Sequence, residues 1–109
     1  MFPPEYIISR MNRKHVSLED IVRLGDITFL AARSLTDSEL LKVQENKHEL
    51  ISQIQNTFGI ERVNLSEYTK MGPEELAPIL KRFVNDPIEV ARTIVSEAIF
   101  WDDFLREKR

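Results

Sequence analysis

The sequence predicts an all-α fold, a small bundle of five or six helices with short connections. No stretch alternates apolar and polar residues for long, and only three glycines occur in 109 residues, so the signals of strands and hairpins are almost absent. Helix-start residues, in contrast, precede most of the apolar segments. The composition, 42% hydrophobic and 30% charged, is that of a globular protein, and the length indicates a single helical domain over residues 1–109.

The first two helices are expected in the N-terminal third of the chain. Pro3 and Pro4 suit the first turn of a short helix that ends near Lys14, because proline lacks only an N–H that is unpaired at that position. Ser17 opens a capping-box-like sequence, which predicts that a second helix covers 18–34.

A third helix is expected over 37–58. Thr36 and Glu39 have the spacing of a capping box, and Gly59 is a fitting residue just after a helix end. The apolar stripe of this helix is interrupted by a polar stretch in which Lys47 falls on the stripe itself. We therefore expect its middle to face solvent or to form a seam whose polar residue sets the register with a partner.

The C-terminal part of the chain predicts three further segments. A short helix is expected over 65–71, and another over 73–85 that starts late or kinks because Pro78 lies too deep for a free position. Pro87 is a strong start signal for the last helix, 88–105.

The last helix carries far more apolar surface than an ordinary surface helix. Its apolar side chains cover roughly two-thirds of the circumference, whereas a stripe of about 100° is usual. They are Ile88, Val90, Ala91, Ile94, Val95, Ala98, Ile99, Phe100, Trp101, Phe104 and Leu105. This helix is therefore expected to be central in the core or to lie at an interface.

No catalytic constellation can be assembled from the sequence, and we expect neither an enzyme nor a cofactor or metal site. Glu45 and His48 have the Glu-x-x-His spacing of helical di-iron bundles, but a single copy occurs, so a solvated polar face is the favoured interpretation. No cysteine is present, which excludes disulfides and thiolate metal ligands.

The favoured hypothesis is a non-enzymatic protein-interaction module: an adaptor, a regulator, an inhibitor or an assembly chaperone, of the kind found among small bacterial or phage accessory proteins. Its partner would be another protein or a second copy in a homodimer. Phe100, Trp101 and Phe104 are the expected anchors, since aromatic residues are enriched in interface hot spots. Leu50 and Ile54, on the seam of the third helix, are further candidates.

The alternative is a DNA-binding regulator with a helix-turn-helix over 18–35 and a basic cluster at 10–15. Gly25 would lie in the turn and Thr28 would open the recognition helix. The candidate contacts are Arg10, Arg13, Lys14 and Arg33. The acidic Asp26 and the net charge of −3 argue against it. The competing interpretation is a continuous helix in which Gly25 lets a neighbouring helix approach closely.

Neither a membrane nor secretion is expected. The longest unbroken apolar run covers 98–101, whereas a spanning helix needs about 20 residues. The first residues lack the basic start and apolar run of a signal peptide. Together with the absence of cysteine, this favours a cytoplasmic protein.

Overall fold

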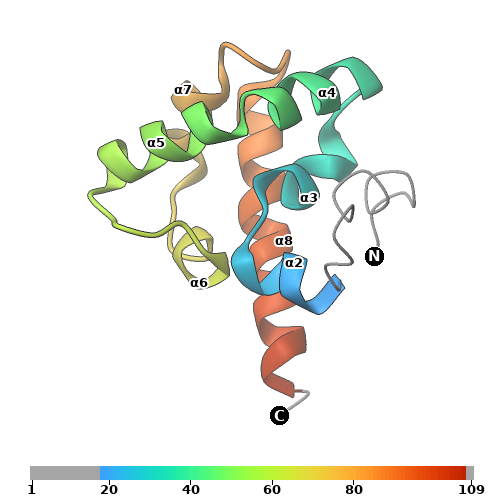
Figure 1. Cartoon of the computed structure of the whole chain (residues 1–109), viewed down its shortest axis with the longest axis vertical. Helices are drawn as coiled ribbons and strands as arrows, with labels where there is room; N and C mark the ends of the chain where they lie inside the picture. Colours follow the sequence, from blue (N-terminus) through green and yellow to red (C-terminus); the bar gives the residue numbers. More distant parts are fainter. Residues whose placement is uncertain (1–17, 108–109) are drawn as a thin grey trace.

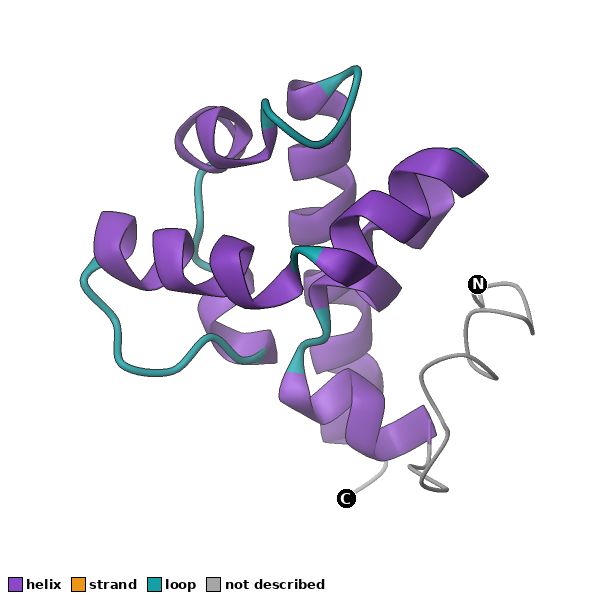
Figure 2. Ribbon diagram, turned by 45° about the horizontal axis from the view of Figure 1, so that its top comes forward, coloured by secondary structure: helices purple, strands orange, loops and turns teal. Residues whose placement is uncertain are grey.

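A computed structural model describes residues 18–107 of the chain, and over these residues the fold is all-α (Figures 1 and 2). Seven α-helices and one 3-10 helix follow one another, with no strand among the described residues. They are α2 (Leu18–Leu24), α3 (Ile27–Ala31), η1 (Ala32–Ser34), α4 (Asp37–Glu45), α5 (Lys47–Phe58), α6 (Leu65–Tyr68), α7 (Pro73–Leu80) and α8 (Pro87–Glu107). The predicted fold class is confirmed. The short helix expected to end near Lys14 lies outside the described residues.

Helix α8 is the central element of the fold. Figure 1 shows it running along the long axis of the molecule, and α3, α6 and α7 pack against it. Its buried residues face these neighbours and are Val90, Ala91, Thr93, Ile94, Glu97, Ala98 and Trp101. Of the two positions expected for this helix, central in the core or at an interface, the structure shows the central one.

The predicted start of α8 is also confirmed. The helix begins at Pro87, and the Glu89 backbone N–H donates to Asp86 Oδ1 at 3.3 Å. Asp86 thereby satisfies one of the N–H groups that have no partner within the first helical turn.

The single helix expected over 18–34 is wrong, because the chain turns at Gly25. Gly25 has a φ of 70°, in the left-handed region, and separates α2 from α3. Asp26 then caps α3 by accepting the backbone N–H of Thr28 on its Oδ1 at 2.9 Å. The expected close approach at Gly25 does occur, and it is made by the backbone at the start of α6.

The single helix expected over 37–58 is likewise divided, into α4 and α5, at Asn46. Asn46 Nδ2 donates back to the carbonyl of Lys42 at 2.8 Å, while Lys47 Nζ lies 3.0 Å from Asp26 Oδ2. The polar stretch that interrupts the apolar stripe therefore forms the bend between α4 and α5. The ion pair of Lys47 with Asp26 connects this bend to the residue that caps α3. Lys47 does not face open solvent.

Glu39 joins the start of α4 to the loop that precedes α8. Its Oε1 accepts the Thr36 N–H at 2.9 Å and its own N–H donates to Thr36 Oγ1 at 3.2 Å, which confirms the predicted capping box. Its Oε2 accepts the Asn85 N–H at 2.6 Å. The hydrogen bonds from Thr36, and then from Asn85, hold the pKa of the Glu39 carboxyl below its ordinary value of 4.5.

The lowered pKa of Glu39 predicts a loss of stability in acid. A carboxyl whose pKa is lower in the folded state stabilises the fold above its unfolded pKa, and this contribution is lost as pH falls through the folded value. We therefore expect the difference in unfolding free energy between wild type and Glu39→Gln to be largest near neutral pH and to shrink below about pH 4. Urea titrations at several pH values measure this difference.

The control for Glu39 is Glu45→Gln, which makes the same change of charge at an exposed position on the same helix. It reports the effect of net charge alone. A stability difference for Glu39→Gln that stays constant from pH 7 to pH 3 would contradict the role assigned to its hydrogen bonds.

Candidate protein-binding surface

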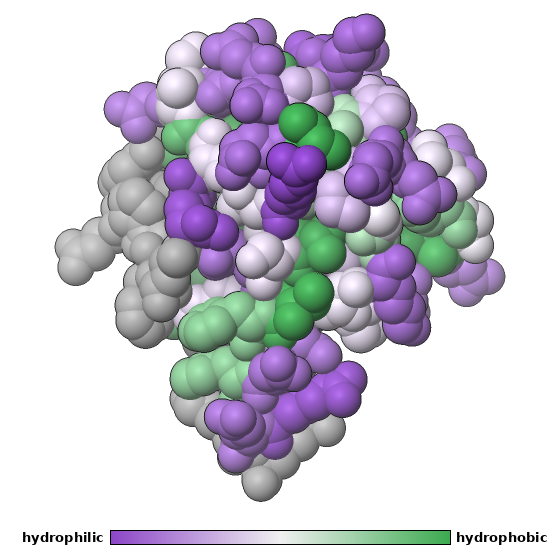
Figure 3. Space-filling view, turned by 180° about the vertical axis from the view of Figure 1, so that it is seen from behind, coloured by the Kyte–Doolittle hydropathy of each residue, from purple (hydrophilic) through white to green (hydrophobic). Residues whose placement is uncertain are grey.

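The C-terminal half of α8 leaves three large apolar side chains in contact with solvent. Ile99 and Phe100 are each 47% exposed and Phe104 is 37% exposed. On a helical wheel Phe100 and Phe104 lie about 40° apart at the border of the buried side of α8, and Ile99 lies about 100° from Phe100, on the side opposite the buried residues. We call these three residues the α8 apolar face. Figure 3, which views the molecule from behind, shows hydrophobic colour gathered over the lower part of the molecule with hydrophilic side chains around it.

An aromatic cluster beneath this face fixes its shape. The rings of Phe100 and Phe104 are stacked, with centroids 6.5 Å apart and planes 13° from parallel. Trp101 meets both edge-on, at 5.2 Å and 5.4 Å, and on its other side contacts Phe29 of α3 at 5.7 Å. Such offset and edge-to-face pairs are the favoured arrangements of aromatic rings. The two exposed phenylalanines therefore stand on a packed support.

Polar contacts hold Trp101 in its place. Its Nε1–H donates to Glu97 Oε1 at 3.4 Å, and Glu97 Oε2 lies 3.4 Å from Arg33 Nε on η1. One turn further toward the start of α8, the hydroxyls of Thr93 and Ser34 also share a hydrogen bond. These contacts fasten η1 to α8 along the edge of the aromatic cluster.

Charged side chains border the α8 apolar face at both ends. Arg92 is exposed nearer the start of the helix, while Asp103 and Glu107 are exposed toward its end. Ser96, also exposed, lies one turn before Phe100 on the same side. An apolar centre with a polar rim is the usual anatomy of a protein interface.

The predicted anchors divide into surface and core residues. Phe100 and Phe104 lie on the surface, but Trp101 is only 2% exposed, and Leu50 and Ile54 are fully buried in the core of the bundle. These last three side chains therefore support the fold and are not accessible to a partner in this structure. Ile99 was missed as a candidate partner residue by sequence reasoning, because its wheel position, about 100° from Phe100, does not distinguish it from the buried Trp101.

The segment predicted to bind DNA, residues 18–35, does not expose a recognition helix that could enter a groove of DNA. All five residues of α3 are buried, so the element that would act as recognition helix is part of the core. Arg33 is nearly half exposed and lies against Glu97. The other candidate contacts, Arg10, Arg13 and Lys14, lie outside the described residues.

The Glu-x-x-His spacing does not produce a shared helical face. Glu45 ends α4 and His48 belongs to α5, so the bend at Asn46 separates them, and both side chains are exposed. Within residues 18–107 no three His, Asp or Glu side chains are grouped so that they could hold one metal ion.

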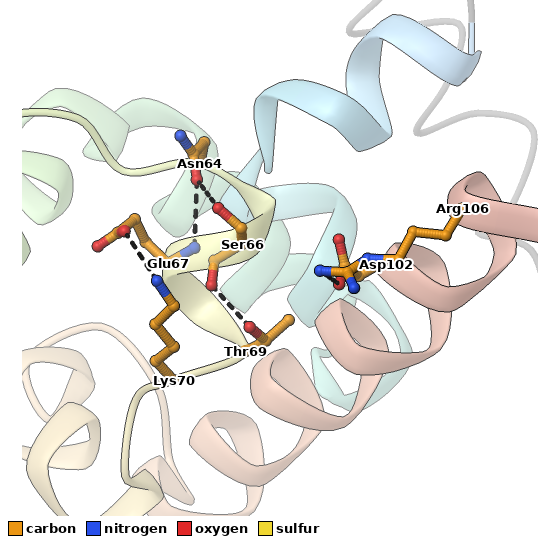
Figure 4. Close-up of polar contacts among 7 residues, drawn as sticks. All are labelled: Asn64, Ser66, Glu67, Thr69, Lys70, Asp102 and Arg106. Atoms are coloured by element: carbon orange, nitrogen blue, oxygen red, sulfur yellow. Dashed lines mark hydrogen bonds and ion pairs between the residues drawn. The ribbon is translucent and has the colours of Figure 1, made fainter. Parts of the chain in front are cut away.

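A polar groove of about 450 Å³ lies beside the last turns of α8, between α2 and α6 (Figure 4). Its polar groups are largely bound to one another: Asn64 Oδ1 accepts the Ser66 hydroxyl at 2.9 Å and the Glu67 N–H at 3.2 Å. On the α8 side, Arg106 pairs with Asp102 at 3.1 Å. These internal bonds cap α6 and stabilise the end of α8, and they leave the apolar face as the stronger candidate.

A second groove, of about 370 Å³, lies between the turn at Gly25 and α5. Leu24 projects beside it and is 68% exposed, while the Lys47–Asp26 ion pair lies in its wall. The other apolar side chains that line it, Ile27, Ile51 and Val63, are buried or half-buried, and Leu24 lacks the aromatic neighbours that surround Phe100.

No family model, curated protein or solved structure matches this chain. Among the helices of residues 18–107, none is both long and apolar enough to cross a bilayer.

Proposed function

We propose that this chain is a non-enzymatic helical module that binds another protein through the α8 apolar face. The observation that carries the proposal is the exposure of three large apolar side chains, Ile99, Phe100 and Phe104, each more than one-third exposed, within two turns of the C-terminal half of α8. An exposed apolar patch with a polar rim is typical of a protein-binding site. An adaptor, a regulator, an inhibitor or an assembly chaperone would each use such a surface.

The size of the patch fits an anchor within a larger contact. Fully burying a large apolar side chain contributes about 1.5–3 kcal/mol, so covering the exposed half of three of them contributes about 2–4 kcal/mol. Association costs more than 4 kcal/mol in lost translational and rotational freedom, so surrounding contacts must add to the patch. A standard interface covers about 800 Å² on each partner.

The support beneath the patch favours binding without rearrangement. Phe100 and Phe104 already pack on Trp101, which is itself held by Phe29 and Glu97. Side chains that are ordered before binding lose less entropy when the partner arrives.

A photo-reactive benzophenone side chain at Ser96 tests this proposal. Ser96 is exposed one turn before Phe100, so irradiation in cells that produce the chain should join it covalently to whatever covers the face. The matched control places the same group at Ser38, an exposed serine on α4. We expect an adduct from Ser96 that is absent from Ser38 and is lost when Phe100→Ser is added.

Three outcomes would contradict the proposed function. They are no adduct at Ser96, the same adduct at both positions, or an adduct that persists unchanged with Phe100→Ser. Circular dichroism of the Phe100→Ser protein verifies that the loss of an adduct does not arise from unfolding.

A further inference from the structure

We propose that residues 1–17 of this chain cover the exposed parts of Phe100 and Phe104 when no partner is bound, and that a partner reaches the α8 apolar face by displacing them. These residues, which precede the described part of the chain, are called the N-terminal segment below. The inference rests on the proposed function and adds to it the way in which the face is regulated.

Charge is unevenly divided between the N-terminal segment and the rest of the chain. The segment has three basic residues, Arg10, Arg13 and Lys14, and one acidic residue, Glu5, so its net charge is +2. Since the whole chain carries −3, residues 18–109 carry −5. Opposite net charges attract the segment to the rest of the chain and favour the part of its surface where acidic side chains gather.

The N-terminal segment combines an apolar stripe with a basic border. In the short helix that the sequence predicts there, Ile7, Ile8 and Met11 fall within about 100° of one another, and Lys14 and Arg10 lie next to this stripe. A helix of this length is marginal in water unless its apolar side is packed. The surface that suits it is apolar and has acidic neighbours.

The C-terminal half of α8 is a surface of this kind. Phe100 and Phe104, both partly exposed, lie about 40° apart on the helical wheel. The exposed acids Asp103 and Glu107 lie within about 60° of Phe100, on the same side of the helix. Opposite charges therefore border the apolar stripe of the segment and that of α8, and such complementarity favours association.

The basic side chains of the described residues near this surface have acidic neighbours of their own. Arg106 lies 3.1 Å from Asp102, and Arg33 lies 3.4 Å from Glu97. Arg92 is about 12 Å before the first of the two phenylalanines along α8, with an exposed glutamate one turn before it. The two acids beside the phenylalanines are therefore the charges that a basic segment meets there.

The N-terminal segment also joins the described part of the chain close to this surface. It ends at Leu18, the first residue of α2, and α2 lies beside the last turns of α8 (Figure 1), where Arg23 and Leu105 line one groove. A ten-residue helix is about 15 Å long, whereas Phe100 to Glu107 spans about 10 Å. Seventeen residues are therefore enough to cover this stretch and to leave a connection to α2.

A segment attached this close to its binding surface needs little affinity of its own. A short tether gives an effective concentration on the order of 1 mM, so a contact with a dissociation constant of about 0.1 mM is occupied about nine-tenths of the time. Because only the open fraction binds a partner, the partner's apparent affinity is then lowered about tenfold.

Cross-linking in the purified full chain tests the contact. A benzophenone side chain at Ser96, one turn before Phe100, is irradiated at low micromolar concentration, and the joined peptides are identified by mass spectrometry. We expect a link from Ser96 to residues 1–17 that leaves the monomer mass unchanged, since the tethered segment is far more concentrated than a second molecule. The same group at Ser38 on α4 should form no such link.

Charge reversal tests whether the basic border holds the segment. Arg10→Glu combined with Lys14→Glu should lower the yield of the Ser96 link by about threefold or more. Arg62→Glu combined with Lys81→Glu makes the same change of net charge at exposed positions of the described chain and should leave the yield unchanged. In cells, reversal in the segment should raise the yield of the adduct between Ser96 and another protein several-fold, because the face is then open more often.

The outcomes separate this inference from the proposed function. If the purified chain forms no link between Ser96 and residues 1–17, while Ser96 captures another protein in cells, the inference is overturned and the proposed function stands. A link that doubles the mass joins two copies and also overturns the inference, as does a link whose yield is unaffected by Arg10→Glu with Lys14→Glu. If the link within one molecule forms but no other protein is captured in cells, even by the reversed variant, the proposed function and the displacement fail while the contact with α8 stands.

Discussion

Replacing Trp101 with alanine is expected to destabilise the folded monomer by about 3–5 kcal/mol, the usual cost of truncating a buried aromatic side chain. Trp101 is 2% exposed and contacts Phe29, Phe100 and Phe104. The change also leaves the Glu97 carboxylate, itself buried, without its indole donor. Since domains of this size are stable by about 5–15 kcal/mol, the loss is a large part of the total.

The neighbouring residue provides the matched control for Trp101. Phe100→Ala removes an aromatic side chain that is 47% exposed, so it should cost clearly less stability in the monomer while weakening the binding assigned to the α8 apolar face. Urea unfolding followed by circular dichroism compares the two, because Trp101 is the only tryptophan and its removal abolishes the fluorescence signal. Equal losses of stability from Trp101→Ala and Phe100→Ala would contradict the division between support and surface.

Helix ends defined by local chemistry were predictable from the sequence. The capping box of Thr36 and Glu39, the start at Pro87 and the end of α5 before Gly59 all depend on residues within a few positions of one another. The break between α4 and α5 also involves a distant contact. The bend at Asn46 accompanies the ion pair between Lys47 and Asp26, which are 21 positions apart in the chain, and no local pattern specifies that distance.

The candidate surface was predictable only as a list of neighbours on a helix. A helical wheel places Phe100, Trp101 and Phe104 on adjacent positions, but it does not determine which of them faces the core. That depends on the position of Phe29, which packs against the side of α8 that carries Trp101. Leu50 and Ile54 were assigned to a partner for the same reason: a narrow stripe on an amphipathic helix has the same pattern whether the rest of the chain or another chain covers it.

Gly25→Ala is expected to destabilise the fold by more than about 2 kcal/mol, through two separate costs. An L-residue in the left-handed region costs about 1–2 kcal/mol, and Gly25 has a φ of 70°. A Cβ atom there would also lie 2.7 Å from the backbone nitrogen of Leu65 and 2.8 Å from the backbone carbon of Asn64. Because both atoms belong to the main chain, α6 would have to move away from the turn, and its contact with α8 would change with it.

Gly59→Ala separates these two costs. Gly59 has nearly the same φ, 65°, but a Cβ atom there meets nothing within 4 Å. The stability that Gly59→Ala loses therefore comes only from the strain of the left-handed backbone conformation. The difference in unfolding free energy between the two alanine variants therefore measures the contact of the turn with α6 alone. If both variants lose the same stability, α6 accommodates the added methyl group and the close approach at Gly25 does not hold α2, α3 and α6 together. If Gly25→Ala loses clearly more, the glycine is required by tertiary packing, which is why a continuous helix through this position was the wrong expectation.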